Sequence, residues 1–334
     1  MVTEGCPRVW PRIILRMNLD HPVLSSLLPV VVLIFIGYVA GRARLVRGES
    51  VRDLSNLVFL VLTQALLFRI MANSHVTQLD FRPVMQYFLV ASVLFFTMLV
   101  VYGGNSRASV MALAGIFSNT LMIGVPLVGL AYGQAGQVLF FTLISLHALI
   151  LLSIATLVLE LQVAREAAAD SGDVRSVWRT VGSAVRSAII HPVPLPILAG
   201  IAYSFTGWGL HPVIDKPLVL LGNAFGPVAL VLVGITLSQT AVGQQWKTAL
   251  QLSLVKTVLH PALMAGVGWL LGLRGLQLGV MVLAAALPIG ANVFLFSQRY
   301  RKEEEAITAA VGVSTAVALF SITVVLALLP LLPG

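Results

Sequence analysis

Two apolar stretches of the sequence carry polar side chains beside proline and glycine, a combination that can form a binding site inside a membrane. The residues concerned are Ser118, Asn119, Thr120, Gly124 and Pro126 in the first stretch, and Pro288, Gly290 and Asn292 in the second. Proline removes a backbone donor and clashes with the preceding helical turn, while glycine frees the backbone. Each stretch is therefore predicted to be an interrupted helix. Because a helix N-terminus carries positive partial charge, such interruptions favour an anionic, carboxylate-bearing solute.

A purely structural role is the alternative for the same residues. Serine, threonine and asparagine often hydrogen-bond membrane helices to one another, and proline often only kinks a helix. Either stretch alone fits that role. Their occurrence in corresponding fourth helices of two halves of the chain favours binding, because paired broken helices mark the substrate site of many transporters.

The elements that hold these residues are predicted to be membrane-spanning helices. Hydrophobic residues make up 58% of the 334 residues, charged residues 10%, and the mean hydropathy is +0.96, whereas soluble domains carry about 25% charged residues. A bilayer leaves backbone groups no water to bond, so long apolar runs must be helices. Ten such runs occur, at 24–41, 54–72, 84–103, 108–132, 138–160, 189–208, 217–240, 248–272, 276–297 and 306–329.

A polar stretch divides the predicted all-α polytopic protein into two halves. We expect an N-terminal tail at 1–23, a first five-helix repeat at 24–160, a linker at 161–188 and a second repeat at 189–330. Five spans per half require that two halves of one fold insert with opposite topology, as a 5+5 inverted repeat. Met17 is an alternative start, which would leave residues 1–16 outside the protein.

The net charge is +8, and the Lys and Arg residues are unevenly divided between the loops on the two sides of the predicted membrane protein. The loops after the odd-numbered helices hold 13 Lys and Arg residues, and the loops after the even-numbered helices hold 3, although Arg8, Arg12 and Arg16 in the tail oppose this difference. The positive-inside rule places the 161–188 linker in the cytoplasm and both termini outside, in the periplasm if the membrane is a bacterial inner membrane. No basic, aromatic-rich segment predicts nucleic-acid binding.

Charged and titratable residues inside the spans are few. Lys256 is predicted to pair with a substrate carboxylate or with backbone at the helix crossing, or else to extend to the interface. His260 and His147 are expected to be packed histidines, with a coupling role for His260 as the alternative. No Asp or Glu lies deep in a span. Coupling to H⁺, coupling to Na⁺ and uncoupled uniport therefore all stay open, and no cofactor or metal is expected.

Several motifs resemble the auxin efflux carrier family, which includes the plant PIN-type exporters and bacterial malate and malonate permeases. The motifs are Asn56-Leu-Val-Phe59, Ala65-Leu-Leu-Phe68, Phe117-Ser-Asn-Thr120, Gly124-Val-Pro126, Leu259-His-Pro261 and Leu287-Pro-Ile-Gly-Ala-Asn292. The resemblance implies ten helices in an inverted repeat similar to the sodium/proton antiporters and bile-acid symporters. It further implies that helices 4 and 9 cross at their breaks, that a transport domain moves against a scaffold of helices 1, 2, 6 and 7, and that homodimers form. Gln64 stands where the family commonly has proline, so the helix 2 lining of the pocket is expected to differ.

The predicted function is a secondary active transporter or uniporter for a small organic anion in the bilayer. The alternatives of the same architecture are a membrane-embedded sensor and a cation-coupled antiporter. An enzyme is not predicted, because the spans lack paired aspartates, Ser/His or Ser/Lys arrangements and the HExxH spacing.

Overall fold

The computed structural model describes residues 22–73, 80–171, 194–239 and 243–329, and these residues form helices joined by short turns. The helices are α1 (Pro22–Arg42), α2 (Gly48–Leu57), α3 (Thr63–Ala72), α4 (Arg82–Val101), α5 (Ser106–Ile116), α6 (Val125–Ser171), α8 (Pro194–Ser204), α9 (Pro212–Gln239), α10 (Trp246–Leu254), α11 (His260–Leu270), α12 (Gly275–Ala286), α13 (Ala291–Tyr300) and α14 (Glu304–Leu328). Three π turns, η1 (Val58–Leu62), η3 (Thr120–Gly124) and η5 (Val255–Leu259), and a 3₁₀ turn, η4 (Gly243–Gln245), link consecutive helices. The described residues contain no β-strand.

Six helical segments are long and apolar enough to cross a membrane. They are Ser50–Ala72, Arg82–Val101, Thr120–Val163, Pro212–Gln239, Gly243–Leu270 and Glu304–Leu328. Four shorter apolar helices accompany them: Leu28–Arg42, Ser106–Ile116, Leu195–Ser204 and Gly275–Ala286. Within α6, Gly133 has φ 60° and ψ −156°, which breaks the helix into two parts. The chain is therefore a multi-pass, all-helical membrane protein.

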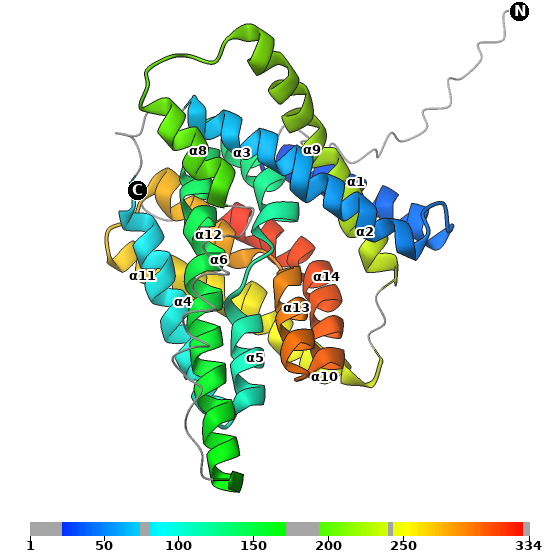
Figure 1. The fold of residues 1–334 in the computed structure, drawn as a ribbon, viewed down its shortest axis with the longest axis vertical. Helices are drawn as coiled ribbons and strands as arrows, with labels where there is room; N and C mark the ends of the chain where they lie inside the picture. The colour runs from blue at the N-terminus through cyan, green and yellow to red at the C-terminus, as the bar shows by residue number, and fades with distance from the viewer. Residues whose placement is uncertain (1–21, 74–79, 172–193, 240–242, 330–334) are drawn as a thin grey trace, which may run out of the picture.

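The helices pack in two groups (Figure 1). In one group α1, α2, α3 and α8 lie against one another or against α9, and in the other α4, α5, α6 and α10 to α14 pack together. Within the first group α1 and α9 approach to backbone contact, because a Cβ on Gly37 would lie 1.9 Å from the Val231 carbonyl oxygen and one on Gly234 1.9 Å from that of Ile34. Only glycine permits such an approach, which is common between membrane helices.

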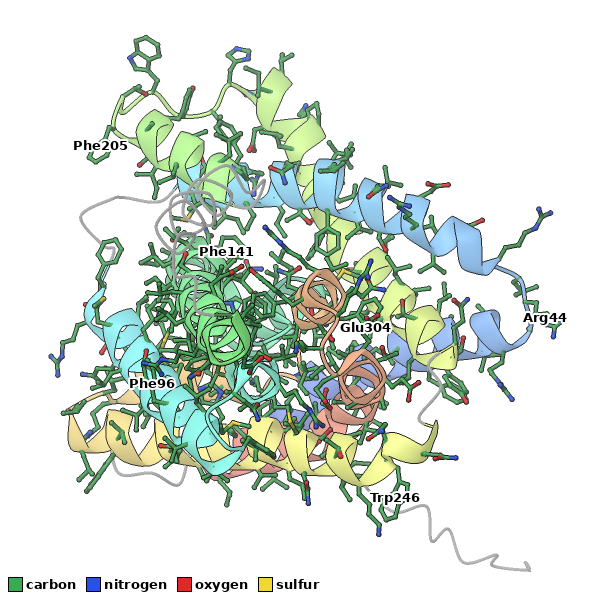
Figure 2. The ribbon with its side chains drawn as sticks, turned by 60° about the horizontal axis from the view of Figure 1, so that its bottom comes forward. Arg44, Phe96, Phe141, Phe205, Trp246 and Glu304 are labelled. Atoms are coloured by element: carbon green, nitrogen blue, oxygen red, sulfur yellow. The ribbon has the colours of Figure 1, made fainter. Side chains whose placement is uncertain are left out.

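Large side chains divide between the interior and the lipid-facing surface (Figure 2). Phe141 is fully buried, in the middle of the second group. Phe205 and Trp246 lie at the periphery and are 73% and 52% exposed. Exposed apolar residues of this size suit a protein whose solvent is a bilayer.

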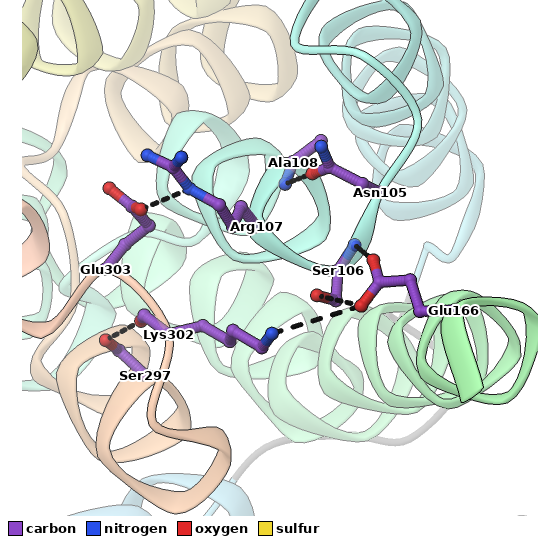
Figure 3. Close-up of polar contacts among 8 residues, drawn as sticks. All are labelled: Asn105, Ser106, Arg107, Ala108, Glu166, Ser297, Lys302 and Glu303. Atoms are coloured by element: carbon purple, nitrogen blue, oxygen red, sulfur yellow. Dashed lines mark hydrogen bonds and ion pairs between the residues drawn. The ribbon is translucent and has the colours of Figure 1, made fainter. Parts of the chain in front are cut away.

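Polar contacts hold the end of α5 that is farthest from its interruption (Figure 3). Glu166 of α6 accepts hydrogen bonds from the Ser106 backbone N–H at 2.7 Å and from its hydroxyl at 2.9 Å. Arg107 pairs with Glu303, and Lys302 Nζ lies 3.9 Å from Glu166. These contacts fix the start of α5 against α6 and against the turn between α13 and α14.

Candidate functional site

The two interrupted stretches meet each other through their backbones. The Asn119 N–H donates to the Pro288 carbonyl at 2.8 Å, and the Gly290 N–H donates to the Phe117 carbonyl at 3.0 Å. These bonds form an isolated antiparallel bridge at Ser118 and Ile289. We call residues 117–119 and 287–290 the crossover. Because a buried backbone group must be paired, each interruption supplies the hydrogen-bond partners that the other lacks.

The second interruption begins where the sequence predicts it. Leu287 has φ −58° and ψ 149°, the extended conformation that a following proline imposes on the residue before it. The helix α12 therefore ends at Ala286, two residues before Pro288, and α13 begins three residues after that proline.

The first interruption lies farther from its proline than the sequence analysis expected. The helix opens at Phe117–Asn119, and Pro126 is the second residue of α6, after the π turn η3. The Asn119 side chain caps the new helical segment by accepting from the Met122 N–H at 3.3 Å. Asparagine is a preferred N-cap residue, so Asn119 rather than Pro126 defines this helix start.

Two glycines allow the close approach at the crossover. A Cβ on Gly290 would lie 2.9 Å from both the Phe117 ring and the Ser118 carbonyl oxygen. A Cβ on Gly124 would lie 2.5 Å from the Phe140 ring and 2.7 Å from a Leu287 methyl group. A Cβ at either position would force neighbouring atoms to move, so both glycines contribute to the close packing.

Lys256 lies behind the crossover and is fully buried. Its Nζ donates to the Ala285 carbonyl at 2.5 Å and to the Leu287 carbonyl at 2.8 Å. These carbonyls end α12, where a helix carries negative partial charge. Of the alternatives drawn from the sequence, the structure shows contact with the backbone at the crossing, and Lys256 does not extend to the interface.

Hydroxyl groups satisfy further backbone atoms of the crossover. The Ser118 hydroxyl donates to the Ala284 carbonyl at 2.7 Å, and the Tyr87 hydroxyl lies 3.1 Å from the Ser118 oxygen. On the other side, the Ile289 N–H donates to the Ser314 hydroxyl oxygen of α14 at 3.0 Å. Three helices outside the interruptions, α4, α14 and the helix that contains η5, therefore hold the crossover in place.

A pocket opens beside the crossover. Its lining residues come from both interruptions and from two neighbouring helices: Phe59, Phe117, Ser118, Asn119, Thr120, Leu121, Met122, Ile144, His147, Ala148, Gly290, Ala291 and Asn292. The pocket has a volume of about 50 Å³, which is enough for a few water molecules or a small anion.

The electrostatics of this pocket favour negative charge. The segment that starts at Thr120 and the helix α13 that starts at Ala291 both begin at the pocket, and the first N–H groups of a helix have no intrahelical acceptor. The Asn119 side-chain NH₂ and the Asn292 amide are additional donors. No Asp or Glu is among the lining residues, so nothing negative in the lining competes with an anionic guest.

The other residues predicted from the sequence to form the site do not line this pocket. Gln64 donates to the Phe59 carbonyl at 2.8 Å and lines a different cavity, beside α8 and α9. Pro126 lines a third cavity, which lies between α1, α3, α6 and α9 and has a volume of about 500 Å³. Gly124, Pro288, Lys256 and His260 lie outside the lining and belong to the packing around it.

His147 is a lining residue that the sequence analysis did not select. It is 1% exposed, and its ring centre lies 4.6 Å from that of Phe117 and 6.0 Å from that of Tyr87. Its Nε2 has no hydrogen-bond partner among the described residues. His260, whose ring centre lies 5.5 Å from that of Tyr87, is also buried, and in the part of the chain that the structure describes neither of its ring nitrogens has a hydrogen-bond partner. In the sequence both residues are single histidines in apolar helices, and no signal there distinguishes them from packed ones.

Comparison with known proteins shows the family of the chain. Residues 22–326 match the family described as Membrane transport protein. The chain belongs to that family, the auxin efflux carriers. It is 24% identical to auxin efflux carrier component 8 of Arabidopsis thaliana, over 87% of this chain and 93% of the relative. It is 26% identical to a putative malonate transporter of Rhizobium meliloti (strain 1021), over 90% of this chain and 94% of the relative.

Family membership settles the broad class of the protein. An auxin efflux carrier family member is a membrane transport protein and not an enzyme. The resemblance inferred from the motifs of the interrupted stretches is thereby confirmed. A third relative, auxin efflux carrier component 3a of Oryza sativa subsp. japonica, is 29% identical over 38% of this chain and 21% of its own length.

Proposed function

We propose that this protein is a secondary transporter or uniporter that carries a small carboxylate-bearing anion and binds it at the crossover. The observation that carries the proposal is the convergence of two helix N-termini and two asparagine side chains, Asn119 and Asn292, on one pocket without an acidic residue in its lining. Backbone N–H groups at a helix start, together with the helix dipole, form an anion site. The putative malonate transporter among the relatives makes a small dicarboxylate the first substrate to test.

Alternating access is the proposed mechanism. The group formed by α1, α2, α3, α8 and α9 serves as scaffold, and the group formed by α4, α5, α6 and α10 to α14 carries the crossover past it. In support, Pro126 faces α9 across the cavity between the groups, where a Cβ on Gly226 would lie 3.5 Å from its side chain. A cavity at such a boundary is where an inverted-repeat transporter admits its substrate.

The proposed topology has ten crossings in two inverted halves. In chain order the ten crossings are α1; α2 joined to α3; α4; α5 joined to the start of α6; the rest of α6; α8; α9; α10 joined to α11; α12 joined to α13; and α14. The fourth and the ninth are the broken ones, as an inverted repeat of five requires. The charge distribution of the loops supports termini outside and a cytoplasmic linker in an inner membrane.

Cation-coupled antiport is less well supported than anion transport. The carbonyls that end α12, which could coordinate a sodium ion, already accept hydrogen bonds from Lys256 Nζ. The lack of carboxylates in the pocket lining argues in the same direction.

The test is uptake of labelled malonate and malate, and of a monocarboxylate such as acetate, into proteoliposomes under imposed proton, sodium and voltage gradients. We expect saturable uptake by the wild type and a loss of about tenfold or more in kcat/KM for Asn119→Ala and Asn292→Ala, because each removes a hydrogen bond to a charged group worth about 1.5–3 kcal/mol. Asn73→Ala is the control, because this asparagine is exposed at the end of α3 and lines neither cavity. Wild-type uptake that both crossover variants retain in full would refute the site.

A further inference from the structure

A basic cavity lies at the far end of α1, away from the crossover. It has a volume of about 630 Å³ and is lined by Gly41, Arg42, Arg44, Val46, Arg47, Ser238 and Gln239. Its wall consists of the end of α1, the turn that leads to α2, and the end of α9. The close packing of α1 on α9 fixes these parts, since a Cβ on Gly41 would lie 2.1 Å from the Ser238 hydroxyl oxygen.

The three arginines of this cavity have no acidic partner among the side chains that the structure describes. Arg42, Arg44 and Arg47 are exposed, and none forms an ion pair with a described side chain. The segment 41–53 contains four arginines against two acids, Glu49 and Asp53. The α2 helix also begins here with Arg47 as N-cap and no side-chain cap, so its first N–H groups add positive partial charge.

Arg44 adopts a backbone conformation that arginine rarely takes. Its φ is 57°, and the turn is closed by the Leu45 N–H bonding the Ala40 carbonyl at 3.0 Å and the Arg44 N–H bonding that of Gly41 at 3.1 Å. This is the left-handed cap position after a helix that usually holds glycine, and a residue with a Cβ costs about 1 kcal/mol there. A charged residue held at such cost suggests a role outside folding. Figure 2 shows Arg44 projecting from this turn at the edge of the molecule.

An apolar surface continues directly from the basic cavity. On α1, Phe35, Ile36 and Val39 are 63%, 50% and 47% exposed, and Leu45 in the turn is 78% exposed. Arginine side chains at the end of a span, with uncovered apolar residues immediately below them, match the two parts of a phospholipid. A free phosphate or phosphate ester would use the arginines and leave the apolar surface unused.

We propose that this cavity binds the head group of an anionic phospholipid whose acyl chains lie along α1. The guanidinium groups bind the phosphodiester, since arginine donates in a planar fork that fits phosphate. By the positive-inside rule this end of α1 faces the cytoplasm, where the leaflet is anionic and basic pockets between membrane helices bind lipid head groups. The α1 and α9 pair belongs to the proposed scaffold, so the lipid anchors that group. The lipid site does not depend on the transported solute.

The experiment measures lipid binding to the full-length purified protein by native mass spectrometry and by thermal unfolding. The probes are phosphatidylglycerol, phosphatidylcholine, glycerol 3-phosphate and inorganic phosphate. We expect phosphatidylglycerol to bind and to raise the unfolding temperature, and the other three to do neither. Arg42→Gln and Arg47→Gln should each weaken phosphatidylglycerol binding about fivefold, given about 1 kcal/mol for each basic residue near an anionic lipid.

Arg44→Gly is the most informative variant. It relieves the left-handed backbone and removes one charge, so the lipid-free protein should unfold at the same or a higher temperature while phosphatidylglycerol binds about fivefold more weakly. Arg52→Gln removes the same charge from the exposed surface of α2, outside the cavity lining, and should bind the lipid as the wild type does. Unchanged lipid binding in all three cavity variants would overturn the proposal. An equal temperature rise with glycerol 3-phosphate or phosphate would overturn the lipid assignment.

Discussion

The Asn119 N–H donates to the Pro288 carbonyl across 169 residues of sequence, at 2.8 Å. This bond and its counterpart from Gly290 to Phe117 join two interrupted helices at the point where each has lost its own hydrogen-bond partners. An interruption alone in a bilayer would leave backbone groups unpaired. The pair is stable because each interruption supplies what the other lacks.

Gly290→Ala should reduce transport strongly. The added Cβ would lie 2.9 Å from both the Phe117 ring and the Ser118 carbonyl oxygen, so the two interruptions must move apart. Gly266→Ala in α11 is the matched control, because nothing lies within 4 Å of a Cβ at that position. Uptake in proteoliposomes, normalised to folded protein, measures both. Equal activity of the two variants would show that the close approach is not needed.

Lys256→Met should lower stability as well as transport. It leaves the Ala285 and Leu287 carbonyls without a donor, at a cost of about 1–3 kcal/mol for each buried unsatisfied group. Lys247→Met, at an exposed position in α10, removes the same charge and should leave the unfolding temperature nearly unchanged. Thermal unfolding in detergent compares the two. A Lys256→Met protein as stable as the wild type would mean that these carbonyls find another partner.

Ser314→Ala should destabilise the protein by roughly 1–3 kcal/mol, because it leaves the buried Ile289 N–H without an acceptor. Ser321→Ala in the same helix removes a hydroxyl that bonds within the helix, to the Ala318 carbonyl at 3.4 Å. This change should lower the free energy of unfolding by about 0.5 kcal/mol or less. The midpoint of thermal unfolding distinguishes them. Equal midpoints would show that Ser314 does not support the crossover.

Glu166→Gln should lower stability more than Arg107→Gln does at the start of α5. Glu166 accepts from both the Ser106 N–H and its hydroxyl at a helix start, where a negative charge contributes about 1 kcal/mol. The side chain of Arg107 is 64% exposed in its pair with Glu303, and exposed pairs contribute about 0–1 kcal/mol. Thermal unfolding at low and at high salt should show a larger loss of stability for Glu166→Gln than for Arg107→Gln. The reverse order would contradict this view of the contacts in Figure 3.

The sequence predicted the two interruptions, but it could not fix where the first one opens. Pro288 determines the second break locally, because proline restricts Leu287 and ends α12. Pro126 has no such effect, since it follows a π turn near the start of α6, and the break is set instead by tertiary bonds from Phe117 and Asn119 to residues about 170 positions away. Local residue types carry no information about partners at that distance.

The pocket was predicted in part for a similar reason. Asn119 and Asn292 were recognisable as polar residues in apolar helices, and both line the pocket. Gln64 was selected by its place in a motif, yet its side chain bonds to the Phe59 carbonyl of its own helix. The sequence indicates only a packed histidine at position 147, and the fold brings His147 beside Phe117. Which face of a uniformly apolar helix meets the pocket depends on packing, because such a helix has little amphipathic pattern.

The central claim is that the crossover binds a carboxylate through its helix starts and the side chains of Asn119 and Asn292. Equilibrium binding to the purified protein tests it most directly, with malonate compared against its uncharged analogue malonamide, in the wild type and in the Asn119→Ala, Asn292→Ala double variant. The account predicts that the wild type binds malonate and not malonamide, and that the double variant loses malonate binding while remaining folded. Equal binding of malonate by the wild type and a folded double variant would contradict it.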